Sequence, residues 1–513
     1  MQLAKRLIAL TIVAFCLNLM SFADDANQVE RWGVFELNLT GPNSGNPYID
    51  VSLHAEFKNG SHVISVPGFY NGNGEYIVRF SPDRLGKWDY STLSKQPELN
   101  KKKGEFECVK PSKNNHGPLK IVNTFYLEYA DGTPFYSVGT TAYQWTSVKQ
   151  SIQEQTLKTL ANSPFNKIRM CVFPKSYKYG NDTEPWVYPY ENKDDFTKPN
   201  FSFFQNFDKR VQQLRDLGVQ ADVILFHPYD RWGYAKMGGE NNARYVRYMI
   251  ARLSAYRNVW WSLANEWDVP DIKETIDWET IGTLLQTEDP HQRFRGIHNW
   301  YASEDHFYDH TRPWITHTST QTSHFFNAAK WRDTYKKPLL FDEMRYEGDV
   351  ESGWGNMSGE EMASYFWMAG LSGGYGTHGD TFKNKSDDET EVRWWAKGGL
   401  LVGRSPQRIA FFKSVMEQLP VKEMAPGFDG NGAPKNLSNN IYTLSKEGEI
   451  YLAYTADANV KIRLRLAGSK PYQLNVIDTW KMTTTPKGEV KPGEFEYTTT
   501  KPYEAVYVTL RGN

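Results

Sequence analysis

The chain has 513 residues, of which 40% are hydrophobic and 15% aromatic, and its formal net charge is −1. This length exceeds what one hydrophobic core usually organises, so we expect about two to four domains, and the apolar content excludes a disordered chain. The near-neutral charge, without a long basic run, argues against nucleic acid and anionic membrane surfaces as partners. We expect a neutral or weakly charged partner. The sequence does not predict an oligomeric state.

The N-terminus has the pattern of a secretory signal peptide. Lys5 and Arg6 precede the apolar residues 7–20, and a small-x-small sequence ending at Ala23 follows. The apolar stretch is too short to span a bilayer, and the small residues are typical of a cleavage site. We therefore predict that residues 1–23 are removed after export to the periplasm or the cell surface. The mature chain is expected to have no transmembrane segment.

Three regions differ in their residue pattern and predict three domains. Residues 24–115 hold short alternating runs between Gly, Pro and Asn clusters, which predicts an Ig-like β-sandwich. From 118 to 422, strand-like and helical runs alternate, as in a parallel β/α fold. The helical period then disappears, so residues 425–513 are predicted to form a second β-sandwich. Cys108 and Cys171, the cysteines left after cleavage, fall in different domains, so we expect no disulfide framework, metal site or other cofactor.

The middle region contains eight strand-like runs, the number that a closed (β/α)8 barrel requires. The fold class is therefore predicted to be α/β, a TIM barrel flanked by N-terminal and C-terminal β-sandwich domains. The candidate strands are residues 135–140, 167–173, 221–227, 259–263, 294–298, 314–317, 338–341 and 374–378.

Polar and ionisable residues gather at the ends of these strands, whereas the strand interiors are apolar. Barrel enzymes carry their catalytic groups at the carboxyl ends of the strands, so this distribution predicts an active site there. The residues concerned are Arg169, His227, Asn265, Glu266, His298, His317, Glu343 and His378.

The clearest of these ends is that of the fourth strand, where an apolar run is followed by Asn265, Glu266 and Trp267. Hydrolysis of a glycoside needs one carboxylic acid to protonate the leaving oxygen and one carboxylate on the other face of the sugar. The tryptophan beside Glu266 supplies apolar surroundings, which raise the pKa of a carboxyl group. We predict that Glu266 is the acid.

The second carboxylate is expected on a later strand, across the barrel mouth. The run that begins at Pro338 is the late strand that ends in acidic residues, Asp342 and Glu343. Glu343 is preferred because it has the same strand parity as Leu339 and Phe341, and a bulge at the strand end would reverse that preference.

These two strand ends resemble the clan A glycoside hydrolases, near family 5 and the apiosidase-like barrels of gut Bacteroidetes. The flanking all-β modules are similar to the sandwiches that accompany such barrels. The resemblance implies retaining hydrolysis of a glycosidic bond in a plant or algal polysaccharide or oligosaccharide. Position by position, it implies that Glu266 is the acid/base and Glu343 the nucleophile. It further implies that Arg169 orients the nucleophile and that Asn265 binds a hydroxyl. His227 and His317 match the strand-end histidines of these barrels.

The chain departs from the family 5 pattern on two strands. The His-x-Tyr of the sixth strand stands here as His317-Thr318-Ser319, without the tyrosine, and residues 374–380 contain no match for the tryptophan of the eighth strand. These departures argue against cellulose and mannan as substrates.

Further substrate contacts are expected from residues just beyond the strand ends, where loops form the rim of a barrel site. Trp232, Trp300, His298 and His378 are the contacts that we predict, together with a wider set of rim candidates that comprises Tyr143, Trp145, Tyr229, Asp230 and Asp380.

Three alternatives remain open from the residues alone. An inverting hydrolase would use the same two carboxylates. A lyase would need a base and positive charge near a uronate, which Arg169 and the histidines could supply. A catalytically inactive barrel that binds carbohydrate would have the same fold.

Overall fold

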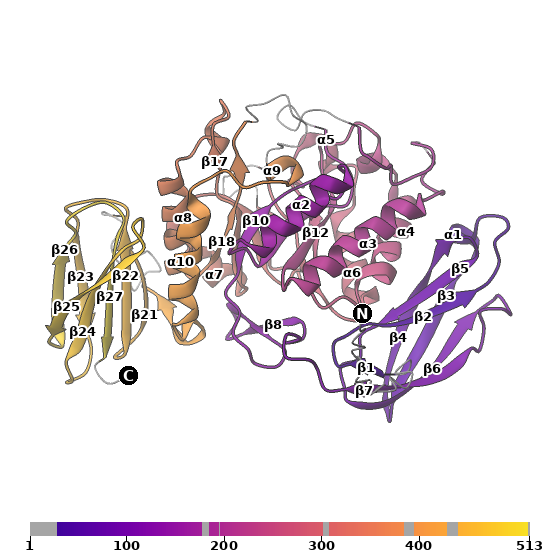
Figure 1. The fold of residues 1–513 in the computed structure, drawn as a ribbon, viewed down its shortest axis with the longest axis horizontal. Coiled ribbons are helices and arrows are strands. Elements are labelled where there is room, and N and C mark those ends of the chain that lie inside the picture. The colour runs from indigo at the N-terminus through magenta and orange to yellow at the C-terminus, as the bar shows by residue number, and fades with distance from the viewer. Residues whose placement is uncertain are drawn as a thin grey trace, which may run out of the picture.

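The structure is a computed structural model, and it describes residues 28–176, 184–193, 195–300, 307–383, 394–427 and 440–510. The predicted signal peptide lies outside these residues. Figure 1 shows a central α/β unit with an all-β module on either side, the N-terminal one in indigo and the C-terminal one in yellow. None of the helices in the described ranges is long and apolar enough to cross a membrane.

The N-terminal module is a seven-stranded sheet with the order β1-β7-β6-β3-β4-β5-β2. The first half of the long strand β4 pairs with β3 and its second half with β5, so the sheet folds over on itself. Aromatic rings fill the space between the two layers, with Phe57 stacked on Phe80 at 4.1 Å and Phe35 on Phe106 at 4.3 Å. The elements are β1 (Gln28–Glu30), β2 (Phe35–Thr40), α1 (Pro47–Asp50), β3 (Leu53–Asn59), β4 (His62–Gly72), β5 (Glu75–Phe80), β6 (Gly86–Ser94) and β7 (Lys103–Val109).

A buried ion-pair cluster joins this module to the central unit. Arg79 of β5 and Arg252 of α4 (Gly239–Leu253) both contact the Asp208 carboxylate of α3 (Phe201–Asp216), each with a nitrogen 2.6 Å from Oδ2. Since removal of one partner would leave a buried charge without compensation, these contacts fix how the module docks on the barrel helices.

The central unit is built on an eight-stranded, all-parallel sheet with the order β14-β13-β12-β11-β10-β18-β16-β15. The first strand in the chain, β10, pairs with the last, β18, so the sheet curls into a barrel. The strands are β10 (Val138–Thr141), β11 (Lys167–Cys171), β12 (Gln220–Phe226), β13 (Val259–Ala264), β14 (Phe294–Gly296), β15 (Thr318–Gln321), β16 (Leu339–Glu343) and β18 (Tyr375–His378).

Helices follow the strands and cover the outside of the barrel (Figure 1). Besides α3 and α4 they are α2 (Gln150–Ala161), α6 (Trp278–Glu288), α7 (Ala328–Tyr335), α8 (Gly359–Leu371) and α10 (Ser405–Glu417). The short helices α5 (Pro270–Lys273) and α9 (Trp394–Lys397) lie at the carboxyl end of the strands instead. A hairpin of β8 (Leu119–Val122) and β9 (Tyr126–Tyr129) precedes the barrel, and β17 (Glu347–Gly348) pairs with β19 (Asp380–Thr381) beside it.

The predicted sixth strand, residues 314–317, is wrong. Trp314 packs on α6, with its indole nitrogen donating to Glu279 at 3.0 Å, and the strand begins only at Thr318. The true strand carries no apolar signal because its inward residue, Ser319, donates a hydrogen bond to the buried carboxylate of Asp342 at 2.6 Å. His317 therefore precedes the sixth strand instead of ending it.

The C-terminal module combines a six-stranded sheet, ordered β20-β21-β22-β27-β24-β25, with the pair β23-β26. Tyr454 attaches it to the barrel by stacking on Trp367 of α8 at 5.6 Å and donating to Ser364 Oγ at 2.7 Å. The strands are β20 (Ala425–Pro426), β21 (Tyr442–Lys446), β22 (Ile450–Thr455), β23 (Lys461–Leu466), β24 (Tyr472–Asp478), β25 (Thr483–Val490), β26 (Gly493–Thr498) and β27 (Glu504–Leu510).

Candidate active site

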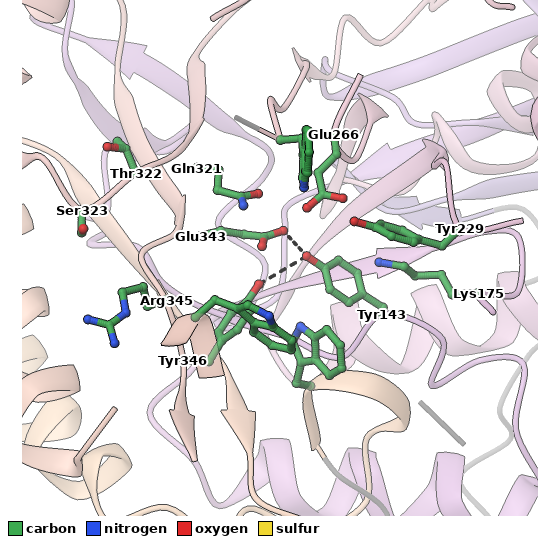
Figure 2. Close-up of a pocket in the computed structure, with 13 residues that line it drawn as sticks. Tyr143, Lys175, Tyr229, Glu266, Gln321, Thr322, Ser323, Glu343, Arg345 and Tyr346 are labelled. Carbon is green, nitrogen blue, oxygen red and sulfur yellow. Dashed lines mark hydrogen bonds between the residues drawn. The ribbon is translucent and has the colours of Figure 1, made fainter. Parts of the chain in front are cut away.

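A cavity of about 510 Å³ opens at the carboxyl end of the barrel strands. Its wall combines the two predicted catalytic glutamates with tyrosines, tryptophans and a lysine, as Figure 2 shows. The lining residues are Tyr143, Lys175, Tyr229, Glu266, Trp300, Gln321, Thr322, Ser323, Glu343, Arg345, Tyr346, Trp354 and Trp395.

Glu343 is the last residue of β16 and is held by two donors. Arg169 Nη1 lies 3.0 Å from Glu343 Oε1, and the Tyr143 hydroxyl donates to the same oxygen (Figure 2). Burial raises the pKa of Glu343, but the neighbouring His298, the charges of Arg169 and Lys175 and the bond from Tyr143 outweigh it and hold this pKa below its ordinary value. His298 is itself neutral at physiological pH, because burial lowers its pKa to about 3, so the positive charges beside Glu343 are those of Arg169 and Lys175.

An irregularity in strand pairing gives Glu343 its position. The register between β15 and β16 shifts after Thr320, which pairs with Phe341, so that Gln321 pairs with Glu343. Phe341 packs against Trp331 of α7 on the helix side, whereas Asp342 points into the barrel, where Lys167 Nζ lies 2.7 Å from its carboxylate. Glu343 therefore reaches the barrel mouth through the register shift and not through shared parity with Phe341, whose side chain faces the helices.

Glu266 follows β13 by two residues and has φ +60°, in the left-handed region that few residues other than glycine adopt. Backbone bonds on both sides hold this conformation, from Asn265 N–H to Phe226 O and from Trp267 N–H to His298 O, each 3.0 Å. The side chain is buried, and burial together with the charge of Glu343 raises the pKa of Glu266 to about 8. It is therefore a protonated acid at neutral pH.

Asn265 is oriented by the arginine that holds Glu343. Arg169 Nη2 donates to Asn265 Oδ1 at 2.9 Å, which fixes the amide with its nitrogen on the other side. Within the described residues this Nδ2 is buried and has no hydrogen-bond partner. A buried donor without a partner is costly unless a ligand completes it, so Asn265 is suited to bind a substrate oxygen.

The predicted histidines do not share one location. His298 is fully buried, with Nε2 4.0 Å from Glu343 Oε1, and lies beside the nucleophile candidate. His227 does not line the cavity, and its Nε2 bonds instead to Phe173 O at 3.1 Å. Burial lowers the pKa of His227 to about 3, so it is neutral at physiological pH.

Two other histidines lie away from the cavity, against expectation. His317 packs on the rings of Trp260 and Phe294, near the starts of β13 and β14, because the sixth strand begins after it. His378 faces outward from the barrel and stacks on Phe165 at 4.8 Å. Its neighbour Thr377 faces inward and donates to Asp342, and successive residues of a strand point to opposite faces.

The two predicted tryptophans also differ in place. Trp300 lines the cavity and is 44% exposed, so its ring is open to a ligand. Trp232 is 5% exposed, does not line the cavity, and donates from Nε1 to Glu184 at 3.2 Å. Of the wider rim candidates, Tyr143 and Tyr229 line the cavity, whereas Trp145 is fully buried and Asp230 accepts backbone bonds from the loop that follows it.

Comparison with known proteins shows the family of the central unit. Residues 122–423 match the family described as "Apiosidase-like, catalytic domain", and residues 28–95 match a domain of unknown function, DUF5060. The chain belongs to the apiosidase-like family. A crystal structure from Bacteroides vulgatus ATCC 8482, provisionally assigned as a glycoside hydrolase, is 34% identical with a TM-score of 0.85, and the match covers 94% of this chain and 100% of that one.

A glycoside hydrolase family 5 structure from Bacteroides vulgatus ATCC 8482 shares the fold at 15% identity, with a TM-score of 0.61 and coverage of 78% of this chain and 94% of that one. Among curated proteins, none matches the chain. The family match and these neighbours make the apiosidase-like protein a glycoside hydrolase.

In this apiosidase-like enzyme, sequence reasoning missed several cavity residues. Lys175 follows β11, Gln321 is the last residue of β15, and Thr322 and Ser323 follow it. The sequence signal that could have found them is their position at or just beyond a strand end. Trp354 and Trp395 lie well beyond the ends of the barrel strands β16 and β18, so no such signal marks them.

Proposed function

We propose that this glycoside hydrolase cleaves its substrate with retention of anomeric configuration, with Glu343 as nucleophile and Glu266 as acid/base. The observation that supports this proposal best is the opposite perturbation of two glutamates that line one cavity. The pKa of Glu343 lies below its ordinary value and that of Glu266 is raised to about 8. Between these values one carboxyl group is an anion and the other holds a proton, as double displacement requires.

The nucleophile has one oxygen available for attack. Arg169 and Tyr143 both bond to Glu343 Oε1, and none of the hydrogen bonds described involves Oε2. In the first step Oε2 attacks the anomeric carbon, and the bond from that carbon to the leaving oxygen breaks. Arg169 and Tyr143 hold the carboxylate in place while it forms the bond to the anomeric carbon.

Glu266 supplies the proton for the leaving oxygen in this step, because it is protonated and lines the same cavity. It becomes a carboxylate as the glycosyl-enzyme forms. In the second step Glu266 takes a proton from water, whose oxygen attacks the anomeric carbon and releases Glu343. The cycle returns both groups to their starting protonation.

Other residues of the site fit a sugar in a supporting role. Asn265 does not line the cavity, but its amide nitrogen has no partner among the described residues, and we assign it to donate to a hydroxyl near the reacting carbon. The rings of Trp300, Trp354 and Trp395 offer flat apolar faces for the C–H faces of sugar rings. We take the substrate to be a plant or algal polysaccharide or oligosaccharide, the flanking modules to be β-sandwiches, and the protein to act after export.

Incubation with a panel of plant and algal polysaccharides, followed by identification of the released sugar, tests this proposal. On the substrate found, Glu343→Gln should abolish turnover and Glu266→Gln should lower it by about 10²- to 10⁴-fold. Glu184→Gln is the matched control, because Glu184 is an exposed carboxylate bonded to Arg231 and Trp232 outside the cavity wall. Wild-type turnover by the Glu266 and Glu343 variants would overturn the assignment.

A further inference from the structure

Lys175 is a buried cation in the wall of the active-site cavity, and the mechanism above gives it no role. Its side chain is 3% exposed, although lysine is almost never buried to this degree without a specific reason. It lies in the loop after β11, and Figure 2 shows its ammonium group directed between Tyr143 and Tyr229.

This ammonium group lies over the rings of both tyrosines. Lys175 Nζ lies 3.5 Å from the ring centroid of Tyr143 and 4.5 Å from that of Tyr229. A cation over an aromatic face is attracted by the ring, more strongly when water is excluded. Tyr143 and Lys175 are both buried, so the closer of the two contacts is of the stronger, water-excluded kind.

Hydrogen bonds tie the lysine segment to both tyrosine segments. Lys175 N–H donates to the side chain of Gln144, the residue after Tyr143, at 3.2 Å. Ser176 N–H donates to the backbone oxygen of Tyr229 at 2.8 Å. The three segments follow β10, β11 and β12, so the loops of three neighbouring strands meet at Lys175.

Each tyrosine contacts a different glutamate. The Tyr143 hydroxyl donates to Glu343, whereas the Tyr229 hydroxyl faces Glu266 (Figure 2) and is among the groups that lower the pKa of that carboxyl. One lysine is therefore linked, through one ring on each side, to both carboxyl groups of the proposed mechanism.

We propose that Lys175 is a positioning residue that holds Tyr143 and Tyr229 against the two glutamates and places one positive charge beside both. The inference rests on the proposed function of Glu266 and Glu343. It predicts that the protonation of both glutamates responds to this one side chain. The ammonium charge lowers the pKa of Glu266 and of Glu343, so its removal should raise both.

Other ionisable groups also face Lys175 in the described residues. Burial lowers the pKa of Lys175, and Cys171, Glu266 and Glu343 oppose that shift while Arg169 adds to it. His227, on the neighbouring strand end, is held neutral in part by the charge of Lys175. Among these groups, the two glutamates are the ones on whose protonation state the proposed mechanism depends.

The test compares Lys175→Met, which keeps the length and removes the charge, with Lys175→Arg, which keeps a cation for the rings. For Lys175→Met we expect kcat/KM to fall about ten- to thirtyfold. Both limbs of its pH profile should move to higher pH by about 1 unit. Lys175→Arg should keep both limbs at their wild-type positions. Lys193→Met is the matched control, because Lys193 lies 4.9 Å from the Tyr188 ring and outside the cavity wall, and it should match the wild type.

If the limbs of the pH profile of Lys175→Met stay at their wild-type positions, the proposal is overturned. A fall in kcat would then indicate a packing role for Lys175, and a rise in KM alone would indicate a role in substrate binding. If Lys175→Met does not fold, Lys175→Arg decides, since a shifted profile in a folded Lys175→Arg would overturn the positioning role and a retained profile supports it. The Glu266→Gln and Glu343→Gln variants distinguish a failure of the lysine inference from a failure of the proposed function. If both stay active, the mechanism fails; if both are inactive while the limbs of Lys175→Met stay fixed, the lysine inference alone fails.

Discussion

Arg169 Nη1 lies 3.0 Å from Glu343 Oε1 in the barrel interior, where the arginine side chain is 0% exposed and that of the glutamate 9%. The other terminal nitrogen of the same guanidinium donates to Asn265. One planar group therefore sets the nucleophile candidate on β16 and the amide after β13 relative to each other.

Arg169→Lys should lower kcat by about 100-fold or more, although it conserves the charge. A lysine ammonium cannot reach both Glu343 and Asn265 in the fork geometry of a guanidinium, so one of the two would lose its position. Steady-state kinetics measure the loss, and circular dichroism verifies that the variant is folded. Near wild-type kcat in Arg169→Lys would mean that charge alone holds the site.

Tyr143→Phe should lower kcat/KM about tenfold and move the acid limb of the pH profile to higher pH. The hydroxyl bond lowers the pKa of Glu343, so its removal raises that pKa, and a higher pH is then needed to ionise the nucleophile. Tyr308→Phe is the control, because its hydroxyl bonds to Glu279, 2.7 Å away and outside the cavity wall. An acid limb that stays in place in Tyr143→Phe would show that this bond does not tune Glu343.

The barrel strands that could be predicted from the sequence are those formed by a continuous run of apolar residues. The run ending at Ala264 is a buried strand on both faces, so its polar continuation, Asn265-Glu266, was recognisable as a strand end. The sixth strand was missed because its inward residue bonds to buried Asp342, and a polar barrel interior removes the hydrophobic pattern on which strand prediction depends.

Side-chain direction was harder to predict than position along the chain. His378 and Glu343 both end barrel strands, yet His378 faces the helices and Glu343 faces the cavity. A one-residue irregularity decides such cases, and the shift at Thr320/Gln321 has no marker in the sequence. The role of Lys175 depends on two rings from neighbouring loops, which spacing along the chain does not reveal.

The wild-type enzyme should have a bell-shaped dependence of kcat/KM on pH. Activity falls at low pH as Glu343 is protonated, below its ordinary pKa of 4.5, and falls at high pH as Glu266 loses its proton near pH 8. We expect the maximum between about pH 5 and pH 7. Initial rates at substrate concentrations well below KM give this profile, and a rate that still rises above pH 9 would contradict a protonated Glu266.

Glu266→Gln should be more stable than the wild type, by a margin that grows with pH. The unfolded carboxyl loses its proton near pH 4.5 and the folded one near pH 8, so the folded wild type binds the extra proton between these values and loses stability as pH rises. Glutamine does not titrate, so this loss disappears. Thermal melting at pH 5 and pH 7.5 measures the margin; an equal Tm difference at both values would refute the raised pKa.

The stereochemistry of the first product tests the central claim most directly. Proton NMR of the anomeric signal, recorded within the first minutes of hydrolysis and before mutarotation, distinguishes retention from inversion. If Glu343 forms a glycosyl-enzyme that Glu266 helps water to cleave, the first sugar released has the anomeric configuration of the substrate. First release of the opposite anomer would contradict the double displacement and the role of Glu343 as nucleophile.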